Sequence, residues 1–295
     1  MEEFTNGKGI YCMKIEKVGV VGCGLMGSGI VEVCARAGYS VTVSEVNQQL
    51  LDKGLAAITN SITRAAERGK ITDEDKKATL GRIKGTTNLE DFKNCNLVIE
   101  AVLEDMARKK DIFRLLDKVC PKTSILATNT SCLAIIEMAM STQRPDKVLG
   151  IHFFNPAPVM KLVEIVKPIA VSQETVSDAK AFAESLGKKV IFAPDSPGFV
   201  VNRLLVPFII DSIRIYEAGT ATAEDIDQGM VLGCNHPMGP LALADLVGLD
   251  TLVMVGNAMY EEFKEPRFAP TPLLKKMVAA GRLGRKTGRG FYQYS

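Results

Sequence analysis

Three glycines near the start of the chain, Gly22, Gly24 and Gly27, form a Gly-x-Gly-x-x-Gly motif between two segments of different periodicity. The apolar run at 17–22 predicts a buried strand, residues 25–37 predict a helix, and residues 41–43 predict a second strand. Strand, tight turn, helix and parallel strand make a βαβ unit, so this part of the chain is restricted to an α/β sheet. Glycines alone could merely serve a turn, but in this context they are typical of a loop that holds a dinucleotide pyrophosphate.

The alternation of strands and helices continues to residue 193 and then stops. We expect strands near 83–87, 97–102, 124–128, 147–153, 161–166 and 189–193, and helices at 48–69, 73–80, 105–119 and 173–186. This order predicts an α/β fold with an N-terminal Rossmann-like, doubly wound sheet of mostly parallel strands. After the breaker cluster Pro194-Asp-Ser-Pro-Gly198, helices are predicted at 199–218, 223–231, 240–262 and 271–280. We therefore expect an N-terminal extension at 1–14, an NAD(P)-binding domain at 15–195 and an all-helical domain at 196–295.

Composition and charge exclude several classes of protein. The formal net charge is +2, there is no tryptophan, and no basic run contains aromatic residues, so nucleic acid is not an expected partner. The first residues, Met-Glu-Glu-Phe-Thr-Asn, are unlike a signal peptide, and no apolar stretch has membrane-spanning length, so no membrane partner is expected. The seven cysteines are scattered and never spaced as Cys-x-x-Cys, which argues against disulfides and a metal site and predicts a cytoplasmic protein.

An acidic residue, Glu45, follows the second predicted strand. At this distance from a glycine motif, a carboxylate typically accepts hydrogen bonds from the ribose hydroxyls of NAD. Its charge would repel the additional phosphate of NADP, and residues 46–49 contain no arginine to bind that phosphate. Glu45 could instead be a solvated loop acid; we favour the ribose role, and with it NAD over NADP.

His152 is one of two histidines and lies in an otherwise apolar run that also contains Glu164. Imidazole is the side chain whose ordinary pKa suits proton transfer near neutral pH. Glu164 shares a strand face with apolar residues, so we expect it to be buried and to need a partner. If residues 155–158 turn the chain back, His152 is that partner, and the pair could exchange a proton with a substrate. The alternative is a core histidine bonded to backbone, with Glu164 paired to Lys161, although Lys161 points to the other face.

Several polar residues have two interpretations that the sequence leaves open. Ser131, with Asn129 beside it, follows a predicted strand and could contact cofactor or substrate, while helix capping by Ser131 fits the spacing equally well. Asn202 could hold a substrate oxygen, but on spacing alone a bond to nearby backbone is preferred. Arg64 and Arg68, near the end of a long helix, could bind phosphate, although a solvated helix face is more common.

From about residue 16 to its end, the sequence resembles the short-chain L-3-hydroxyacyl-CoA dehydrogenases, most of all their bacterial 3-hydroxybutyryl-CoA branch. Several long motifs in the same order carry the resemblance, namely Val-Gly-Cys-Gly-Leu-Met-Gly, Ala-Thr-Asn-Thr-Ser, His-Phe-Phe-Asn-Pro-Ala-Pro-Val-Met-Lys-Leu-Val-Glu, Ser-Pro-Gly-Phe-Val-Val-Asn-Arg, Asn-His-Pro-Met-Gly-Pro-Leu and Gly-Arg-Lys-Thr-Gly-Arg-Gly-Phe-Tyr. It implies a homodimeric oxidoreductase that interconverts (S)-3-hydroxybutyryl-CoA and acetoacetyl-CoA by hydride transfer with NAD. The alternatives are a dehydrogenase of a free 3-hydroxy acid and a catalytically silent relative.

The resemblance also implies roles for individual residues. His152 would be the acid/base with Glu164 as its partner, and Ser131 and Asn202 would bind the reacting oxygen. Cofactor contacts would come from Gly22, Gly24, Leu25, Met26, Gly27, Glu45, Glu104, Lys109, Ser131, Asn155 and Lys286, and contacts with coenzyme A from Ser61, Arg64, Arg68 and Ser131. The chain has arginines where the family often has lysines, and Glu45 where the family usually has aspartate. Bacterial members include NADP users, so the resemblance allows NADP as well as NAD.

Overall fold

The computed structural model describes residues 5–6, 10–11 and 13–294. The chain divides into two compact units, the first ending at Asp195 and the second beginning at Ser196. Within the expected N-terminal extension, β1 (Thr5–Asn6) and β2 (Ile10–Tyr11) form a short antiparallel pair that the sequence pattern did not indicate. The other residues of that extension up to residue 12 lie outside the described part.

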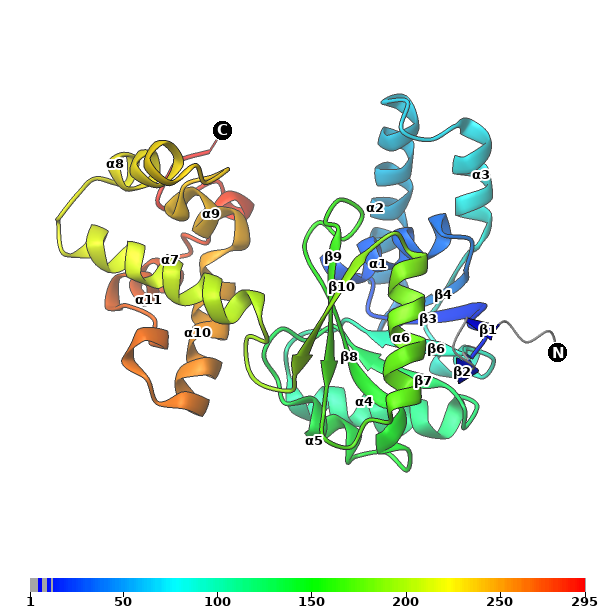
Figure 1. The fold of residues 1–295 in the computed structure, drawn as a ribbon. Helices are drawn as coiled ribbons and strands as arrows, with labels where there is room; N and C mark the ends of the chain where they lie inside the picture. Colours follow the sequence, from blue (N-terminus) through cyan, green and yellow to red (C-terminus); the bar gives the residue numbers. More distant parts are fainter. Residues whose placement is uncertain (1–4, 7–9, 12, 295) are drawn as a thin grey trace. The chain divides into compact units, whose positions relative to one another are not determined.

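The first unit is built on an eight-stranded sheet with the order β10-β9-β8-β7-β6-β3-β4-β5 (Figure 1). Neighbouring strands pair in parallel except β8 and β9, which are antiparallel. The chain order reverses between β3 and β6, and ligands of doubly wound sheets bind beside the carboxyl ends of strands at such a point. The strands are β3 (Lys17–Val21), β4 (Ser40–Ser44), β5 (Ile83–Thr86), β6 (Leu97–Glu100), β7 (Ile125–Thr128), β8 (Val148–Phe153), β9 (Leu162–Lys167) and β10 (Lys189–Pro194).

Helices cover both faces of this sheet, so alternate strand residues enter two separate cores. Ile99 and Ile151 pack into a core shared with α1, α2 and α6, whereas Gly150, on the other face of β8, is approached by Ile135 of α5. His152 alternates with Ile151 and therefore points to the α5 side. The helices are α1 (Leu25–Arg36), α2 (Gln48–Glu67), α3 (Asp73–Gly81), α4 (Met106–Val119), α5 (Ile135–Ala139) and α6 (Gln173–Ser185), with short 3-10 turns η1 (Leu89–Phe92) and η2 (Pro145–Lys147).

The second unit is helical, in agreement with the predicted fold class, but its third predicted helix is two helices. We expected one helix over 240–262; instead Gly248, with φ of 101°, separates α9 (Pro240–Val247) from α10 (Leu249–Phe263) at a bend of 94°. This φ suits glycine and ends a helix, although the apolar pattern continues across it. Among the described helices, no single one is long and apolar enough to cross a membrane, and only this bent pair passes such a test together. The remaining elements are α7 (Val201–Glu217), α8 (Ala223–Gln228), η3 (Gly229–Gly233), η4 (Pro266–Phe268), α11 (Pro272–Ala279) and η5 (Arg285–Thr287).

Candidate active site

A buried histidine and a buried glutamate face each other across β8 and β9. The antiparallel register pairs His152 with Glu164, and His152 Nδ1 lies 2.6 Å from Glu164 Oε2. A carboxylate can only accept, so the imidazole Nδ1–H is the donor in this contact. His152 is 4% exposed and Glu164 is 0% exposed, which makes the interaction strong because water cannot compete for either group.

Ser131 lies on the other side of the imidazole. Its Oγ is 3.2 Å from His152 Nε2, so one ring nitrogen contacts a carboxylate and the other a hydroxyl. With the proton on Nδ1, neutral imidazole presents Nε2 as an acceptor, which is the state a general base requires. Asn129 fixes the same region, because its Oδ1 accepts a hydrogen bond from the Phe153 amide at the end of β8.

The alternative role for Ser131, capping of the following helix, is taken by other residues. Helix α5 begins at Ile135, and the amides of Ile135 and Ile136 donate to the carboxylate of Asp195 at 2.9 and 2.7 Å. The preceding amide of Leu133 donates to Thr130 Oγ1. Because Asp195 is the last residue of the first unit, the end of that unit is tied directly to the segment that carries Ser131.

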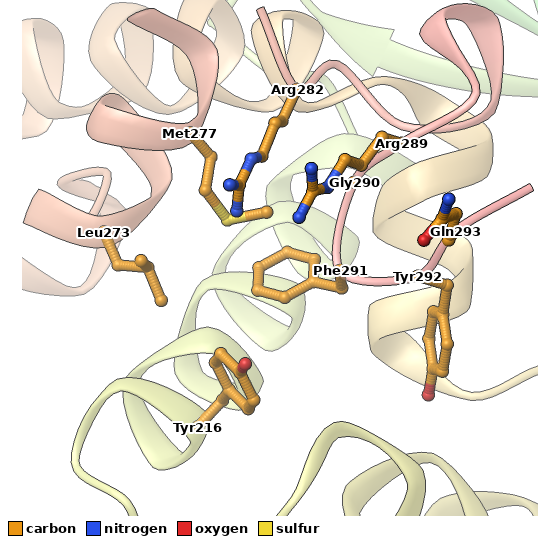
Figure 2. A pocket seen from close by; sticks show the side chains of 9 residues that line it. All are labelled: Tyr216, Leu273, Met277, Arg282, Arg289, Gly290, Phe291, Tyr292 and Gln293. Carbon is orange, nitrogen blue, oxygen red and sulfur yellow. The ribbon is translucent and has the colours of Figure 1, made fainter. Parts of the chain in front are cut away.

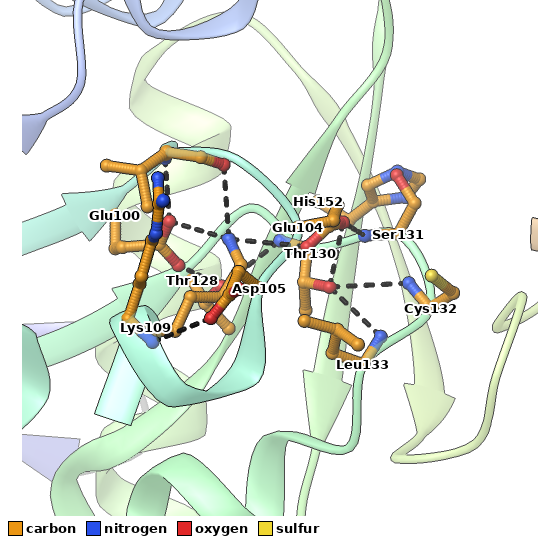
Figure 3. A network of polar contacts seen from close by, with 12 residues as sticks. Glu100, Glu104, Asp105, Lys109, Thr128, Thr130, Ser131, Cys132, Leu133 and His152 are labelled. Atoms are coloured by element: carbon orange, nitrogen blue, oxygen red, sulfur yellow. Dashed lines mark hydrogen bonds and ion pairs between the residues drawn. The ribbon is translucent and has the colours of Figure 1, made fainter. Parts of the chain in front are cut away.

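A buried ionic network beside this segment was not predicted from the sequence (Figure 3). Glu100, at the end of β6, is 0% exposed and accepts hydrogen bonds from Lys109 Nζ at 2.6 Å, from the Val102 amide at 2.7 Å and from Thr128 Oγ1 at 2.7 Å. The strand predicted at 97–102 ends at Glu100, whose carboxylate accepts this bond from the chain two residues later. An acid at the end of the apolar run Leu97-Val-Ile-Glu100 was the available signal, since a buried carboxylate needs partners.

The same network reaches Ser131 through Glu104. Glu104 Oε1 accepts hydrogen bonds from the Ser131 amide at 2.8 Å and from Thr130 Oγ1 at 2.9 Å, while its Oε2 forms an ion pair with Lys109 Nζ at 3.3 Å. Lys109 is 1% exposed. The ammonium of this expected cofactor residue is therefore bonded inside the protein, and in this structure it acts on the site through Glu104.

The glycine loop shows which of its glycines the fold itself requires. A Cβ on Gly27 would collide with the carbonyl oxygen of Gly22, and Gly22 has a φ of 96°. At Gly24, in contrast, φ is −71° and a Cβ would meet no described atom within 4 Å. Packing against the described residues therefore does not explain Gly24.

Glu45 lies at the carboxyl end of β4 and holds this loop. Its Oε1 accepts from the Cys23 amide at 2.7 Å and its Oε2 from the Val46 amide at 3.1 Å. A carboxylate has about four acceptor positions, so these bonds leave capacity for ribose hydroxyls. The exposed side chains of Val46 and Leu25 beside it, 82% and 75% exposed, offer apolar surface to a flat ring.

A basic pocket of about 660 Å³ lies along α2. Ser61, Arg64 and Arg68 all line it, and so does Lys70, with Glu32 as its one acidic lining residue. Glu32 is already paired with Arg36 at 3.3 Å, so the pocket has an excess of positive charge. A concave pocket with excess positive charge is typical of an anion-binding surface.

Three further expected site residues lie on other segments of the chain. Asn155 is exposed just after β8. Asn202, in the first turn of α7, makes no side-chain hydrogen bond with the residues that the structure describes, so the preferred backbone bond is not formed. Lys286 Nζ contacts both carboxylate oxygens of Asp250 at 2.5 and 2.6 Å. Asn202 and Lys286 belong to the second unit.

Comparison with known proteins identifies the family. The family model described as 3-hydroxyacyl-CoA dehydrogenase, NAD binding domain, matches residues 17–196, and the model of the C-terminal domain of that family matches residues 198–294. This chain belongs to the 3-hydroxyacyl-CoA dehydrogenase family. The resemblance inferred from the sequence motifs is therefore confirmed, as is the predicted combination of a Rossmann-like domain and a helical domain.

Full-length relatives support the same conclusion. The 3-hydroxybutyryl-CoA dehydrogenase of Mycobacterium tuberculosis is 50% identical over 282 residues, covering 95% of this chain and 99% of that protein. The enzyme of the same name from Clostridioides difficile is 48% identical, covering 95% and 99%. The crystal structure of M. tuberculosis FadB2 has a TM-score of 0.95 at 50% identity and covers 96% of this chain and 100% of that one. The structure of (S)-3-hydroxybutyryl-CoA dehydrogenase PaaH1 from Ralstonia eutropha has a TM-score of 0.91 at 45% identity, with coverage of 96% and 100%.

Proposed function

We propose that this dehydrogenase interconverts (S)-3-hydroxybutyryl-CoA and acetoacetyl-CoA. The observation that carries the proposal is the contact series Glu164–His152–Ser131, with separations of 2.6 and 3.2 Å, at the carboxyl end of β8. It provides an oriented base and a hydroxyl that can bond the reacting oxygen. The substrate is supported by the names of the relatives, which match over nearly the whole chain.

The bound nicotinamide cofactor supplies the hydride acceptor in oxidation and the donor in reduction. In oxidation, His152 Nε2 takes the proton of the substrate hydroxyl, and Glu164 stabilises the imidazolium that results. Ser131 Oγ, next to Nε2, holds the substrate oxygen, and Asn202 would contribute its amide to the same oxygen. In reduction His152 returns the proton to that oxygen. The buried position of the pair keeps water from competing for the proton.

The residues present fit a dinucleotide, and they favour NAD over NADP. Gly24 leaves room for the pyrophosphate at the N-terminus of α1, and Glu45 is held by backbone amides where ribose hydroxyls would lie. Its negative charge disfavours a 2′-phosphate, and no arginine occurs at 46–49 to compensate. By the resemblance to the family, Glu104, Lys109, Asn155 and Lys286 would also contact the cofactor.

The basic pocket along α2 would hold the phosphates of coenzyme A. Arg64 and Arg68 supply guanidinium groups, which bind phosphate through paired N–H donors, and Ser61 adds a hydroxyl. We also propose a cytoplasmic homodimer. The scattered cysteines fit a reducing compartment, and the exposed Leu204 and Leu232 of the second unit offer apolar surface to a second copy.

The decisive experiment is acetoacetyl-CoA-dependent oxidation of NADH, measured beside NADPH. We expect turnover with NADH and a lower kcat/KM with NADPH. A second reaction with free acetoacetate separates the competing function, because a dehydrogenase of free 3-hydroxy acids would reduce it efficiently. No turnover of the thioester with either cofactor would exclude the proposed activity.

A further inference from the structure

The second unit contains a pocket that the proposed reaction does not use. It encloses about 310 Å³ between α7, α11 and the C-terminal segment (Figure 2). It is lined by Tyr216, Leu273, Met277, Arg282, Arg289, Gly290, Phe291, Tyr292 and Gln293. All nine residues belong to the second unit, so the pocket is formed by that unit alone.

Two arginines converge in this pocket without an acid between them. Figure 2 shows the guanidinium groups of Arg282 and Arg289 turned toward one another above the ring of Phe291. None of the lining residues is acidic, and within the described residues neither guanidinium has a hydrogen-bond or ion-pair partner. Two cations that line one pocket repel each other, and an anion between them turns that repulsion into attraction. Guanidinium groups bind carboxylate and phosphate with paired donors.

The floor of the pocket is apolar and aromatic. Phe291 contacts Tyr216 edge to face, with ring centroids 5.5 Å apart, and the buried Met277 lies next to them. Such a surface would pack against the flat or apolar body of a ligand and would gain little from a bare inorganic ion. The positive charge of the two arginines and the apolar floor of the pocket together favour a small organic anion as ligand.

The two arginines also bracket the turn that carries Lys286. The Gly284 amide donates to the Arg289 carbonyl at 2.9 Å, which closes the chain into a short loop between the two guanidinium-bearing residues. An anion that bridges Arg282 and Arg289 would therefore tie together both ends of this loop. Its binding would slow the opening of the backbone hydrogen bonds at 284–290.

We propose that this pocket binds a small organic anion, with a phosphate or carboxylate group between Arg282 and Arg289 and an apolar body on Phe291. The pocket shares no lining residue with the catalytic cluster or with the basic pocket along α2. The site therefore stands whether or not the enzyme turns over acetoacetyl-CoA.

The test uses tryptophan fluorescence as the reporter of binding. The chain has no tryptophan, so Phe291→Trp places a single fluorophore in the pocket of the full-length protein. Phenyl phosphate, benzoate and inorganic phosphate are titrated while tryptophan emission is recorded. We expect a saturable change with at least one of the two aromatic anions, and an affinity for inorganic phosphate at least tenfold lower. Arg282→Gln or Arg289→Gln in the reporter should weaken binding about tenfold or more, as for the loss of one charge-assisted bond.

The matched control is Arg64→Gln with Arg68→Gln in the same reporter, because those arginines line the other basic pocket. It should leave the titration unchanged. Calorimetry on the natural sequence, with and without Arg289→Gln, guards against an effect of the tryptophan itself. The proposal is overturned if neither aromatic anion binds, if binding depends on Arg64 and Arg68 instead, or if Arg282→Gln and Arg289→Gln have no effect. It is also overturned if a second copy of the chain covers the pocket. The tryptophan emission would then not change with added anion until the protein is diluted to monomers.

Discussion

Replacing Lys109 with methionine should strongly destabilise the first unit. Its Nζ lies 2.6 Å from Glu100 and 3.3 Å from Glu104, and its side chain is 1% exposed. Lys109→Met keeps most of the volume but leaves the 0% exposed Glu100 carboxylate without its counterion. Breaking a buried ion pair in this way costs about 3–5 kcal/mol. At roughly 2–4 °C for each kcal/mol in a domain of this size, Tm should fall by about 6–20 °C.

The neighbouring lysine provides the control. Lys110 also forms an ion pair, with Glu137, but those side chains are 27% and 51% exposed, so Lys110→Met should cost at most about 1 kcal/mol. Both variants are compared by calorimetry and by urea unfolding followed by circular dichroism. Glu100→Gln added to Lys109→Met should restore part of the lost stability, because no uncompensated charge remains at residue 100. Equal Tm values for Lys109→Met and the natural protein would refute the reasoning.

Three other predictions test separate parts of the structure. Gly24→Ala should fold normally but bind NADH at least tenfold more weakly in a fluorescence titration. Gly27→Ala should lower Tm as well, because only this substitution introduces a clash with Gly22. Equal Tm values for the two variants would contradict this prediction. Arg68→Gln should raise the KM for acetoacetyl-CoA roughly three- to tenfold and leave the KM for acetoacetyl-pantetheine, which lacks the nucleotide, unchanged. An equal rise in KM for both thioesters would exclude phosphate binding by Arg68. Burial alone would raise the pKa of Asp117, but bonds from the Gln143 amide and the Arg144 guanidinium hold that pKa below its ordinary value of 3.8. The ionised Asp117 therefore stabilises the fold above pH 3.8, and this stabilisation is lost as the pH falls through the lower folded pKa. Asp117→Asn should be less stable than the natural protein at pH 7, and its free energy of unfolding, measured with urea, should fall less steeply toward acid pH. Parallel pH profiles of the two proteins would contradict this prediction.

Local patterns in the sequence predict the first unit well because its elements are marked by local chemistry. The glycine motif and the apolar strands locate the βαβ start. The helix predicted at 73–80 is α3, which Thr72 caps with a reciprocal bond to Asp75. Even the approach of His152 to Glu164 could be inferred, since two short strands joined by a proline-rich turn tend to pair. The register that places them opposite each other follows from the length of that turn, which a pattern does not determine.

The features that the sequence did not predict depend on contacts between distant residues. The break at Gly248 interrupts an apolar pattern that continues on both sides, so only the backbone conformation reveals it. Glu100 was expected within the strand at 97–102 and Lys109 within the helix at 105–119, and only the packing of α4 brings them together. In the same way Asp195 caps α5 from 59 residues away, and this removes the capping role from Ser131. Tertiary contacts of this kind, not propensities, decide which polar residue does which task.

The central claim is that His152, oriented by Glu164, transfers the proton. The measurement that tests it most directly is kcat for acetoacetyl-CoA reduction by NADH in His152→Gln, with the NADH Kd determined on the same preparation. Loss of the general acid should lower kcat by about 10²–10⁴-fold. The Kd for NADH should stay the same, because the proposed contacts with the pyrophosphate and the ribose come from the glycine loop and Glu45. Turnover within a few fold of the natural enzyme would contradict the claim.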